Sequence, residues 1–290
     1  MKGTLLAFFT LTSAVCFAQP KVYTQAIINT TTNVIAPEEE DVQDLGRGQD
    51  GGGRGGMNFR NMMDGETKFV TVLKNDLVKT AIRSEMGKST IYRDNSKKIT
   101  TTILQMMGNE SGFFVSDEEQ VAMQKRRDSM MAERRKKDTS SKTNNNFDRE
   151  KTAPQTEIVY TDETKKIAGY VCKKGFLITT RFLGAKDTAN IWVAPDFKIQ
   201  NLLSTGSITG MPGMGNMGGL NGLDKIEGFL MRYEMKMRRG RRMEVEVTKV
   251  DLDAKIDDKE FEVPTDIEIK PMREMQNMFG GNGMQRGGRD

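Results

Sequence analysis

The fold class of this chain is indicated by the stretch Phe229-Leu230-Met231-Arg232-Tyr233-Glu234-Met235-Lys236-Met237-Arg238. Its apolar side chains alternate with mostly charged ones, and a period of two places the two sets on opposite faces of a β-strand. Arg239-Gly240 can then form a tight hairpin turn, and the stretch from Met243 to Thr248 alternates in the same way. The alternation slips by one residue at Lys249, which predicts a β-bulge at that position.

Short runs of β-forming residues, separated by turn residues, recur on both sides of this hairpin. Such repeated short strands with close turns favour an antiparallel meander and a mainly β protein. The runs are Val22–Ile28, Phe69–Leu73, Leu77–Ser84, Ser89–Arg93, Ile99–Met106, Gly112–Val115, Glu157–Tyr160, Ile167–Cys172, Phe176–Arg181, Ile191–Val193 and Phe261–Pro264.

One helix interrupts the β pattern, over Asp117 to Lys137. Ser116 can cap this helix, and Asp117, Glu118 and Glu119 occupy its first turn, where negative charge complements the helix dipole. Basic residues fill the other end, at 134–137. Because its apolar stripe is thin, we predict a solvated helix that rests lightly on the sheet.

These boundaries divide the chain into segments. They are a signal peptide at 1–18, the N-terminal part of a β domain at 19–116 with a flexible acidic and Gly-rich insert at 36–65, the charged helix and a polar linker at 117–154, the C-terminal part of the β domain at 155–271, and a flexible Met- and Gly-rich tail at 272–290.

Composition excludes several functions. The 290 residues contain no histidine, so no catalytic triad, histidine base or histidine metal ligand exists. A net charge of +4 is too small to argue for nucleic acid as a partner. The paired carboxylates, Asp257-Asp258 and Glu38-Glu39-Glu40, lie in turns or linkers with nothing to exclude water. We therefore predict a protein that is not an enzyme, needs no cofactor and binds no nucleic acid.

The first eighteen residues have the pattern of a cleavable secretory signal. Lys2 supplies the positive charge, Leu5 to Leu11 opens the apolar core, and Cys16-Phe17-Ala18 offers small residues before a cleavage site at Gln19. We expect export to the periplasm or the cell exterior. Cys16 is an alternative lipidation site, although Val15 stands where a lipobox has Gly or Ala. After cleavage Cys172 is the remaining cysteine, and we expect it buried in a strand.

Five segments of the second half, in this order, resemble a family of exported bacterial envelope proteins, the domain of unknown function DUF4412. The segments are Lys166–Lys173, Ile191–Asp196, Gly228–Glu234, Met243–Val250 and Asp257–Pro264. Proteins of this family look like relatives of the lipoprotein-localisation factors LolA and LolB. The resemblance implies a curved antiparallel sheet, an open half-barrel, with helices or loops across a concave side that holds acyl chains in the lipoprotein carriers. It implies no catalytic residue.

The apolar face of the quoted strand is the first candidate site. Methionine and aromatic side chains form adaptable pockets for varied apolar ligands, including lipid or lipoprotein acyl chains. The alternative is an ordinary core face beneath a covering helix. The candidate residues are Phe229, Met231, Tyr233, Met235, Met237 and Trp192.

Two further clusters offer other functions. Met211, Met214 and Met217 lie in a Gly/Pro-rich loop, and three thioethers could bind Cu(I) or Ag(I), unless they only reflect the abundance of methionine. Basic residues surround the hairpin turn and could contact an anionic membrane surface, or simply keep the hairpin tip solvated. This second set is Arg238, Arg239, Arg241 and Arg242, with Arg232 and Lys236 on the preceding strand.

The sequence therefore predicts an exported, non-enzymatic envelope protein that binds a lipidic or apolar ligand on the concave face of a half-barrel. A Cu(I)-binding protein is the first alternative. A structural or interaction protein of the envelope, with a protein partner that the sequence does not identify, is the second.

Overall fold

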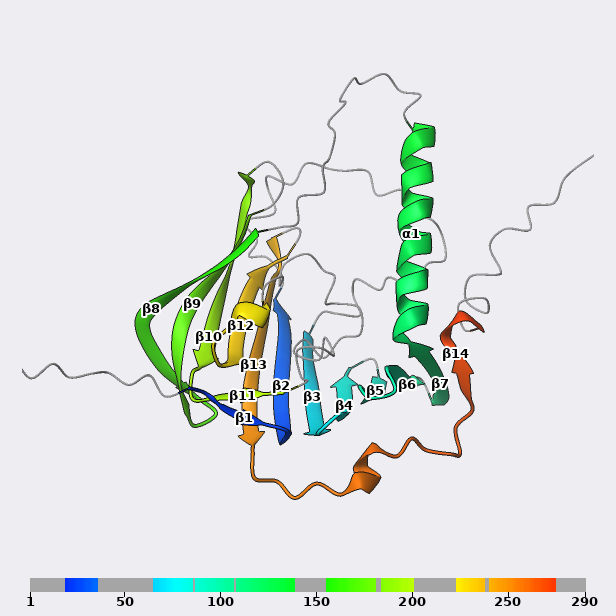
Figure 1. The fold of residues 1–290 in the computed structure, drawn as a ribbon, viewed down its shortest axis with the longest axis horizontal. Coiled ribbons are helices and arrows are strands. Elements are labelled where there is room, and N and C mark those ends of the chain that lie inside the picture. Colours follow the sequence, from blue (N-terminus) through cyan, green and yellow to red (C-terminus); the bar gives the residue numbers. More distant parts are fainter. Residues whose placement is uncertain are drawn as a thin grey trace, which may run out of the picture.

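The computed structural model describes residues 19–35, 65–85, 87–106, 108–138, 155–180, 184–200, 223–237 and 240–274 (Figure 1). The predicted signal peptide, nearly all of the insert at 36–65, the linker at 139–154 and the tail beyond 274 lie outside these ranges. Within them, twelve strands form one large sheet and two more strands form a small parallel pair.

The strands of the large sheet follow one another along its width, and all neighbours are antiparallel except the outermost pair of β14 and β7. The sheet is curved and does not close into a barrel, which confirms the predicted fold class (Figure 1). In spatial order the strands are β14 (Ile269–Pro271), β7 (Asn109–Ser116), β6 (Ile99–Met106), β5 (Gly87–Asp94), β4 (Leu77–Ser84), β3 (Gly65–Lys74), β2 (Gln25–Ile35), β13 (Arg242–Asp251), β12 (Phe229–Lys236), β10 (Lys186–Ala194), β9 (Tyr170–Thr180) and β8 (Gln155–Ile167).

The β-bulge predicted at Lys249 is confirmed. The register between β13 and β2 shifts between Val247 and Lys249, so Thr248 is the extra residue. A second bulge, which the sequence analysis did not predict, lies between β10 and β12. There Trp192 pairs with Arg232 but Val193 pairs with Leu230, so Met231 has no partner in this register. Each bulge changes which face the following side chains occupy.

Two predicted strands are wrong. The run Ile167–Cys172 is a hairpin, because β8 ends at Ile167, β9 begins at Tyr170, and Ala168 (φ 48°) and Gly169 (φ 90°) between them adopt the positive φ of a tight turn. The run Phe261–Pro264 is not a strand either. A 3₁₀ turn, η9 (Asp258–Phe261), ends there, and the Asp257 carboxylate caps it by accepting a hydrogen bond from Lys259 N.

The apolar core consists of two clusters. Cluster 1 lies where the small sheet of β1 (Lys21–Tyr23) and β11 (Phe197–Ile199) packs against the large one, and the Phe197 and Phe229 rings stack 5.1 Å apart at its centre. Its buried residues are Ala26, Ile28, Leu73, Val78, Ile167, Cys172, Trp192, Ala194, Phe197, Ile199, Phe229, Met231 and Val247. Cluster 2 consists of Leu177, Ala189, Ile191, Val193, Ile226, Leu230, Tyr233, Met243 and Val245.

The segment after β13 runs past the ends of the strands towards β14 (Figure 1). Lys74 Nζ binds Asp258 at 2.6 Å and Lys79 Nζ binds Glu260 at 3.0 Å, which fixes this segment to β3 and β4. It ends in β14, which lies parallel to β7. Gly112 permits that contact, since a Cβ there would lie 2.3 Å from Ile269 Cδ1.

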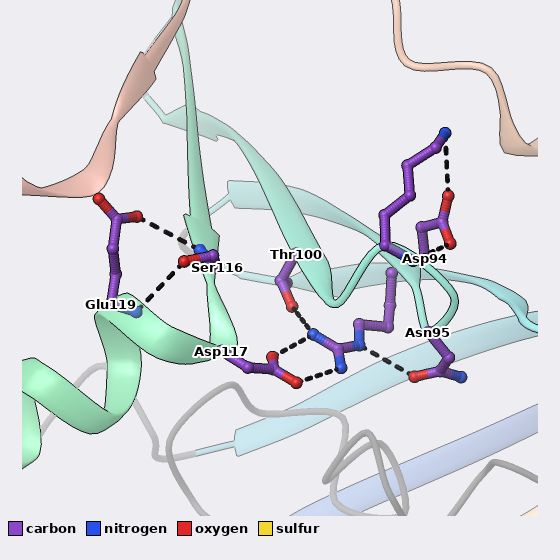
Figure 2. A network of polar contacts seen from close by, with 8 residues as sticks. Asp94, Asn95, Thr100, Ser116, Asp117 and Glu119 are labelled. Atoms are coloured by element: carbon purple, nitrogen blue, oxygen red, sulfur yellow. Dashed lines mark hydrogen bonds and ion pairs between the residues drawn. The ribbon is translucent and has the colours of Figure 1, made fainter.

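The predicted helix is α1 (Asp117–Asp138), and Ser116 caps it as expected. Glu119 N donates to Ser116 Oγ at 3.2 Å, and Ser116 N donates to Glu119 Oε2 at 3.3 Å, which is a complete capping box (Figure 2). The helix continues from β7 and rises away from the sheet, rather than lying across its concave side as the family resemblance implied (Figure 1). No helix among the described residues has the length and apolarity to cross a membrane.

A bidentate ion pair anchors the start of α1 to the sheet. Arg93 Nη1 and Nη2 donate to the two carboxylate oxygens of Asp117 at 2.5 and 2.8 Å (Figure 2). Arg93 also donates to Asn95 Oδ1 at 3.0 Å and to Thr100 Oγ1 at 3.2 Å, so these contacts fix the orientation of its guanidinium group. The bond from Arg93 lowers the pKa of Asp117. This pair links the first residue of α1 to β5.

We expect Asp117→Asn to loosen α1, measured as faster amide hydrogen exchange over 117–138. Because the folded pKa of Asp117 is lowered, its stabilisation is present above the pKa of an unfolded aspartate, about 4, and is lost as the pH falls below that value. The same loosening should therefore appear in the natural chain on acidification. Glu118→Gln is the matched control, since it removes a first-turn charge that does not contact Arg93. Equal effects of the two changes would contradict the anchoring role.

We expect Gly228→Ala to destabilise the protein more than Gly169→Ala in urea unfolding. Both glycines have positive φ, 135° and 90°, so alanine is strained at either position by about 1–3 kcal/mol. Only at Gly228 would the new Cβ also collide with backbone, 2.3 Å from Ala194 O, whereas nothing lies within 4 Å at Gly169. Similar unfolding midpoints for both variants would show that the turn before β12 is not tightly packed.

Candidate functional site

The structure distributes the predicted ligand-binding residues over both clusters. Phe229 and Met231 belong to cluster 1, together with Trp192, whereas Tyr233 belongs to cluster 2. The bulge opposite Trp192 and Val193 causes this division, since it interrupts the alternation of β12. It also buries Leu230, which the sequence pattern assigned to the charged face.

The outer part of the candidate face is more accessible than the inner part. Met231 and Tyr233 are 0% and 1% exposed, whereas Met235 and Met237 are half-buried and pack against cluster 2 from its edge. Methionine side chains are unbranched and adjust to irregular apolar surfaces. The half-buried methionines are therefore the part of the face that can contact a ligand without unfolding the strand.

A small cavity lies on this face, where residues of clusters 1 and 2 meet. Its volume is about 20 Å³, enough for about one water molecule. The lining residues come from four adjacent strands, β3, β2, β13 and β12. They are Ile28, Thr30, Thr71, Phe229, Leu230, Met231, Arg232, Tyr233, Val245 and Val247.

Tyr233, one of these lining residues, has an unusual hydroxyl group. It is buried and has no hydrogen-bond partner, and burial raises the pKa of the phenol, so it stays a neutral donor. Thr71, which also lines the cavity, forms a hydrogen bond with the hydroxyl of Thr80 at 3.2 Å. A buried hydroxyl without a partner costs free energy, and native proteins usually provide such a group with a partner. Sequence reasoning treated Tyr233 as an apolar contact and missed this polar role.

A short segment before β12 covers part of cluster 2. It consists of η7 (Leu223–Lys225) and Ile226, whose side chain is buried in the cluster while Leu223 packs against it. Lys225 Nζ donates to the backbone oxygen of Thr156 at 2.7 Å, which ties the segment to β8 at the edge of the sheet. Leu223 and Ile226 have no periodic signal in the sequence, because they belong to a single turn rather than to a long element.

The predicted basic cluster is partly neutralised. Arg232 Nη1 contacts Glu246 Oε2 at 2.9 Å, Nη2 contacts Glu244 Oε2 at 3.5 Å, and Nη2 also bonds Glu234. Three carboxylates around one guanidinium give this part of the hairpin a formal charge of −2. Arg242 is exposed at the start of β13, Arg241 is half-buried beside the turn, and Arg238 and Arg239 lie outside the described residues.

Metal binding finds no support in the described part of the chain. Met211, Met214 and Met217 all lie outside it, so the predicted Cu(I) loop stays a prediction. Among the residues that the structure describes, no group of three or more His, Cys, Asp or Glu is placed to hold a metal ion.

Cys172 is buried in cluster 1, as the sequence predicted. Its Sγ lies 3.5 Å from the backbone oxygen of Tyr170, and burial raises the pKa of the thiol to about 11. Since the thiolate is the reactive form of cysteine, Cys172 is a packing residue at neutral pH.

The fold and the site define a class: an open antiparallel sheet with a partly covered apolar face. The particular family is a domain of unknown function, DUF4412, which matches residues 55–267. The chain belongs to this family, as the sequence resemblance predicted, and the family description assigns no activity.

Two solved structures match this chain at low similarity. PNGF-II, solved in the C2 space group, is 14% identical with a TM-score of 0.37, and the match covers 88% of this chain and 32% of PNGF-II. This chain therefore spans about a third of PNGF-II. A domain named for outer membrane lipoprotein sorting, from Vibrio parahaemolyticus, is 7% identical with a TM-score of 0.18, covering 82% of this chain and 88% of that domain. No curated protein matches the chain.

We expect Cys172 to resist a thiol reagent at neutral pH in the folded protein and to react fully in urea. The test uses a Cys16→Ser chain, in which Cys172 is the single cysteine, and follows the release of thionitrobenzoate. Fast reaction without denaturant would show that cluster 1 opens readily, and it would reopen the question of a reactive thiol.

Proposed function

We propose that this protein binds an elongated apolar ligand, such as a lipid acyl chain, on the cluster 2 side of its sheet. Tyr233, Met235 and Met237 are the proposed contacts from β12. The observation that carries the proposal is the buried hydroxyl without a partner on Tyr233, a residue that lines a small cavity on a face of methionine and aliphatic side chains. The pattern of residues 1–18 supports export, which would place this activity in the cell envelope.

The cavity is too small for an acyl chain as it stands. Ligand pockets usually have volumes of about 300–1,000 Å³, far above the 20 Å³ of this cavity. A ligand must therefore displace side chains that now fill the face. Leu223 and Ile226 are the natural candidates, because they belong to one short turn that is held to β8 through Lys225.

Displacement of this turn would uncover the apolar groups that it covers in cluster 2. An acyl chain in its place would restore the lost burial, at about 25 cal/mol per Å² of apolar surface. The half-buried Met235 and Met237 lie beside this position and can adapt to the shape of the chain.

The polar end of the ligand would contact the Tyr233 hydroxyl. The Tyr233 hydroxyl is a donor, so the group that reaches it must be a hydrogen-bond acceptor. Arg232 also lines the cavity, but its charge is already balanced by Glu234, Glu244 and Glu246. Those carboxylates repel an anion, so an ester or amide carbonyl suits the site better than a free carboxylate.

The experiment measures binding of 1-N-phenylnaphthylamine, a neutral fluorescent apolar probe, and its displacement by a neutral fatty acyl ester. We expect Met235→Asp to weaken binding at least tenfold, because a carboxylate replaces an apolar contact. Val70→Asp is the matched control, since Val70 on β3 is an apolar side chain that is 40% exposed. Equal binding by both variants and the natural chain would contradict the assigned face.

Tyr233→Phe tests the polar end separately. It keeps the ring and removes the hydroxyl, so the fold should become slightly more stable while displacement by the ester weakens about tenfold. Binding of the probe itself, which has no carbonyl, should hardly change. If the ester and the probe respond alike, the hydroxyl does not contact the ligand.

A further inference from the structure

Two threonine hydroxyls at the β8–β9 end of the cluster 2 face are buried without a partner. Thr156 and Thr179 lie directly opposite each other on these neighbouring strands, and Thr179 is 1% exposed. Neither side-chain oxygen has a hydrogen-bond partner within the part of the chain that the structure describes. A buried hydroxyl without a partner costs free energy, so the pair is a candidate site for a polar group from outside the chain.

Another threonine pair of the same sheet shows that such neighbours can bond to each other. Thr71 of β3 and Thr80 of β4 are also directly opposite and buried, and their hydroxyls form a hydrogen bond at 3.2 Å. Thr156 and Thr179 have the same cross-strand relation but form no such bond. Both of their hydroxyls therefore remain available to a third group.

The pair lies on the face of the sheet that carries cluster 2. Thr156 is two residues from Ile158 and Thr179 is two residues from Leu177, and these two apolar residues pair with each other and belong to cluster 2 or pack against it. Residues two apart along a strand share a face. The turn before β12 also reaches this place, since Lys225 Nζ donates to the backbone oxygen of Thr156 at 2.7 Å. A ligand that displaces this turn would therefore reach the two hydroxyls.

The distance from this pair to Tyr233 suits an acyl chain. Tyr233 pairs with Ile191, which in turn pairs with Gly175 of β9. Thr179 is four residues further along β9, and the buried, apolar Leu177 lies between them. At about 3.3 Å per residue and about 4.8 Å per strand, the Cα atoms of Tyr233 and Thr179 are about 16 Å apart. An apolar chain between two polar ends fits this order of side chains.

The charges around the pair favour a neutral group. Asp187 of β10 is directly opposite Thr179, and the Lys225 ammonium lies beside Thr156. Asp187 would repel a carboxylate or a phosphate, and Lys225 would repel an amine. A hydroxyl is neutral and can both donate and accept hydrogen bonds, so one ligand hydroxyl can bond both threonines.

We propose that Thr156 and Thr179 bind a hydroxyl group of the ligand, so that the ligand is an acyl ester whose far end is hydroxylated. This inference rests on the proposed function, because it uses the same face and the same displaced turn. It adds a second polar contact, about 16 Å from Tyr233, and with it a preference for hydroxylated chains over plain ones.

The binding test uses methyl dodecanoate and methyl 12-hydroxydodecanoate, each as a displacer of 1-N-phenylnaphthylamine from the full chain. We expect the hydroxylated ester to bind about tenfold more tightly, as one net hydrogen bond provides. Thr179→Val keeps the shape of the side chain and should remove this preference, whereas Thr179→Ser should keep it. A preference that survives Thr179→Val would overturn the proposal.

The same experiment separates this proposal from the proposed function. If both esters displace the probe equally well from the natural chain, the apolar site exists and the hydroxyl site does not. If neither ester displaces the probe, the proposed function fails and this proposal fails with it.

A second measurement needs no ligand. Because the Thr179 hydroxyl has no partner to lose, Thr179→Val should raise the urea midpoint of unfolding. Thr80→Val is the matched control, since it removes a hydroxyl that bonds Thr71 and should lower the midpoint. If Thr179→Val lowers the midpoint as Thr80→Val does, the Thr179 hydroxyl already has a partner or a bound water, which would contradict its availability to a ligand.

Discussion

The pairing of β2 with β13 is the contact on which the rest of the sheet depends. β2 also pairs with β3, so this one strand joins β3–β7 to the strands of the second half. Thr32 lies between Val245 of β13 and Thr67 of β3, and all three are buried. Residues more than two hundred positions apart must meet before cluster 1, which contains residues of both halves, can form, and such distant pairings form slowly.

The two bulges then determine which side chains lie on each face of this continuous sheet. The bulge at Thr248 returns Val250 to the face of Ile28, with which it pairs, so the apolar face continues to the end of β13. The bulge opposite Trp192 has the reverse effect and divides the face of β12 between two clusters. The cavity lies at this division, because side chains that diverge from a bulge leave space between them.

Because the sheet is open, it has two edge strands and an apolar face that other parts of the chain must cover. One edge is protected by β14, whose Pro271 offers no backbone donor, and the other edge is the long strand β8. The helix α1 does not cover the concave side, and within the described residues the turn at 223–226, with its tether to β8, packs on cluster 2. The proposed ligand binding rests on this thin cover of cluster 2 and on a buried hydroxyl without a partner.

Local patterns in the sequence were sufficient for most of the strands, the helix, its Ser116 cap and the bulge at Lys249, because period, capping and turn chemistry act between neighbouring residues. The family also followed from the order of short segments. Long-range packing decided the rest: the bulge opposite Trp192, the turn at Ala168-Gly169, the covering role of Ile226 and the missing partner of Tyr233. Each depends on which strands meet and in what register, and no stretch of sequence read alone contains that information.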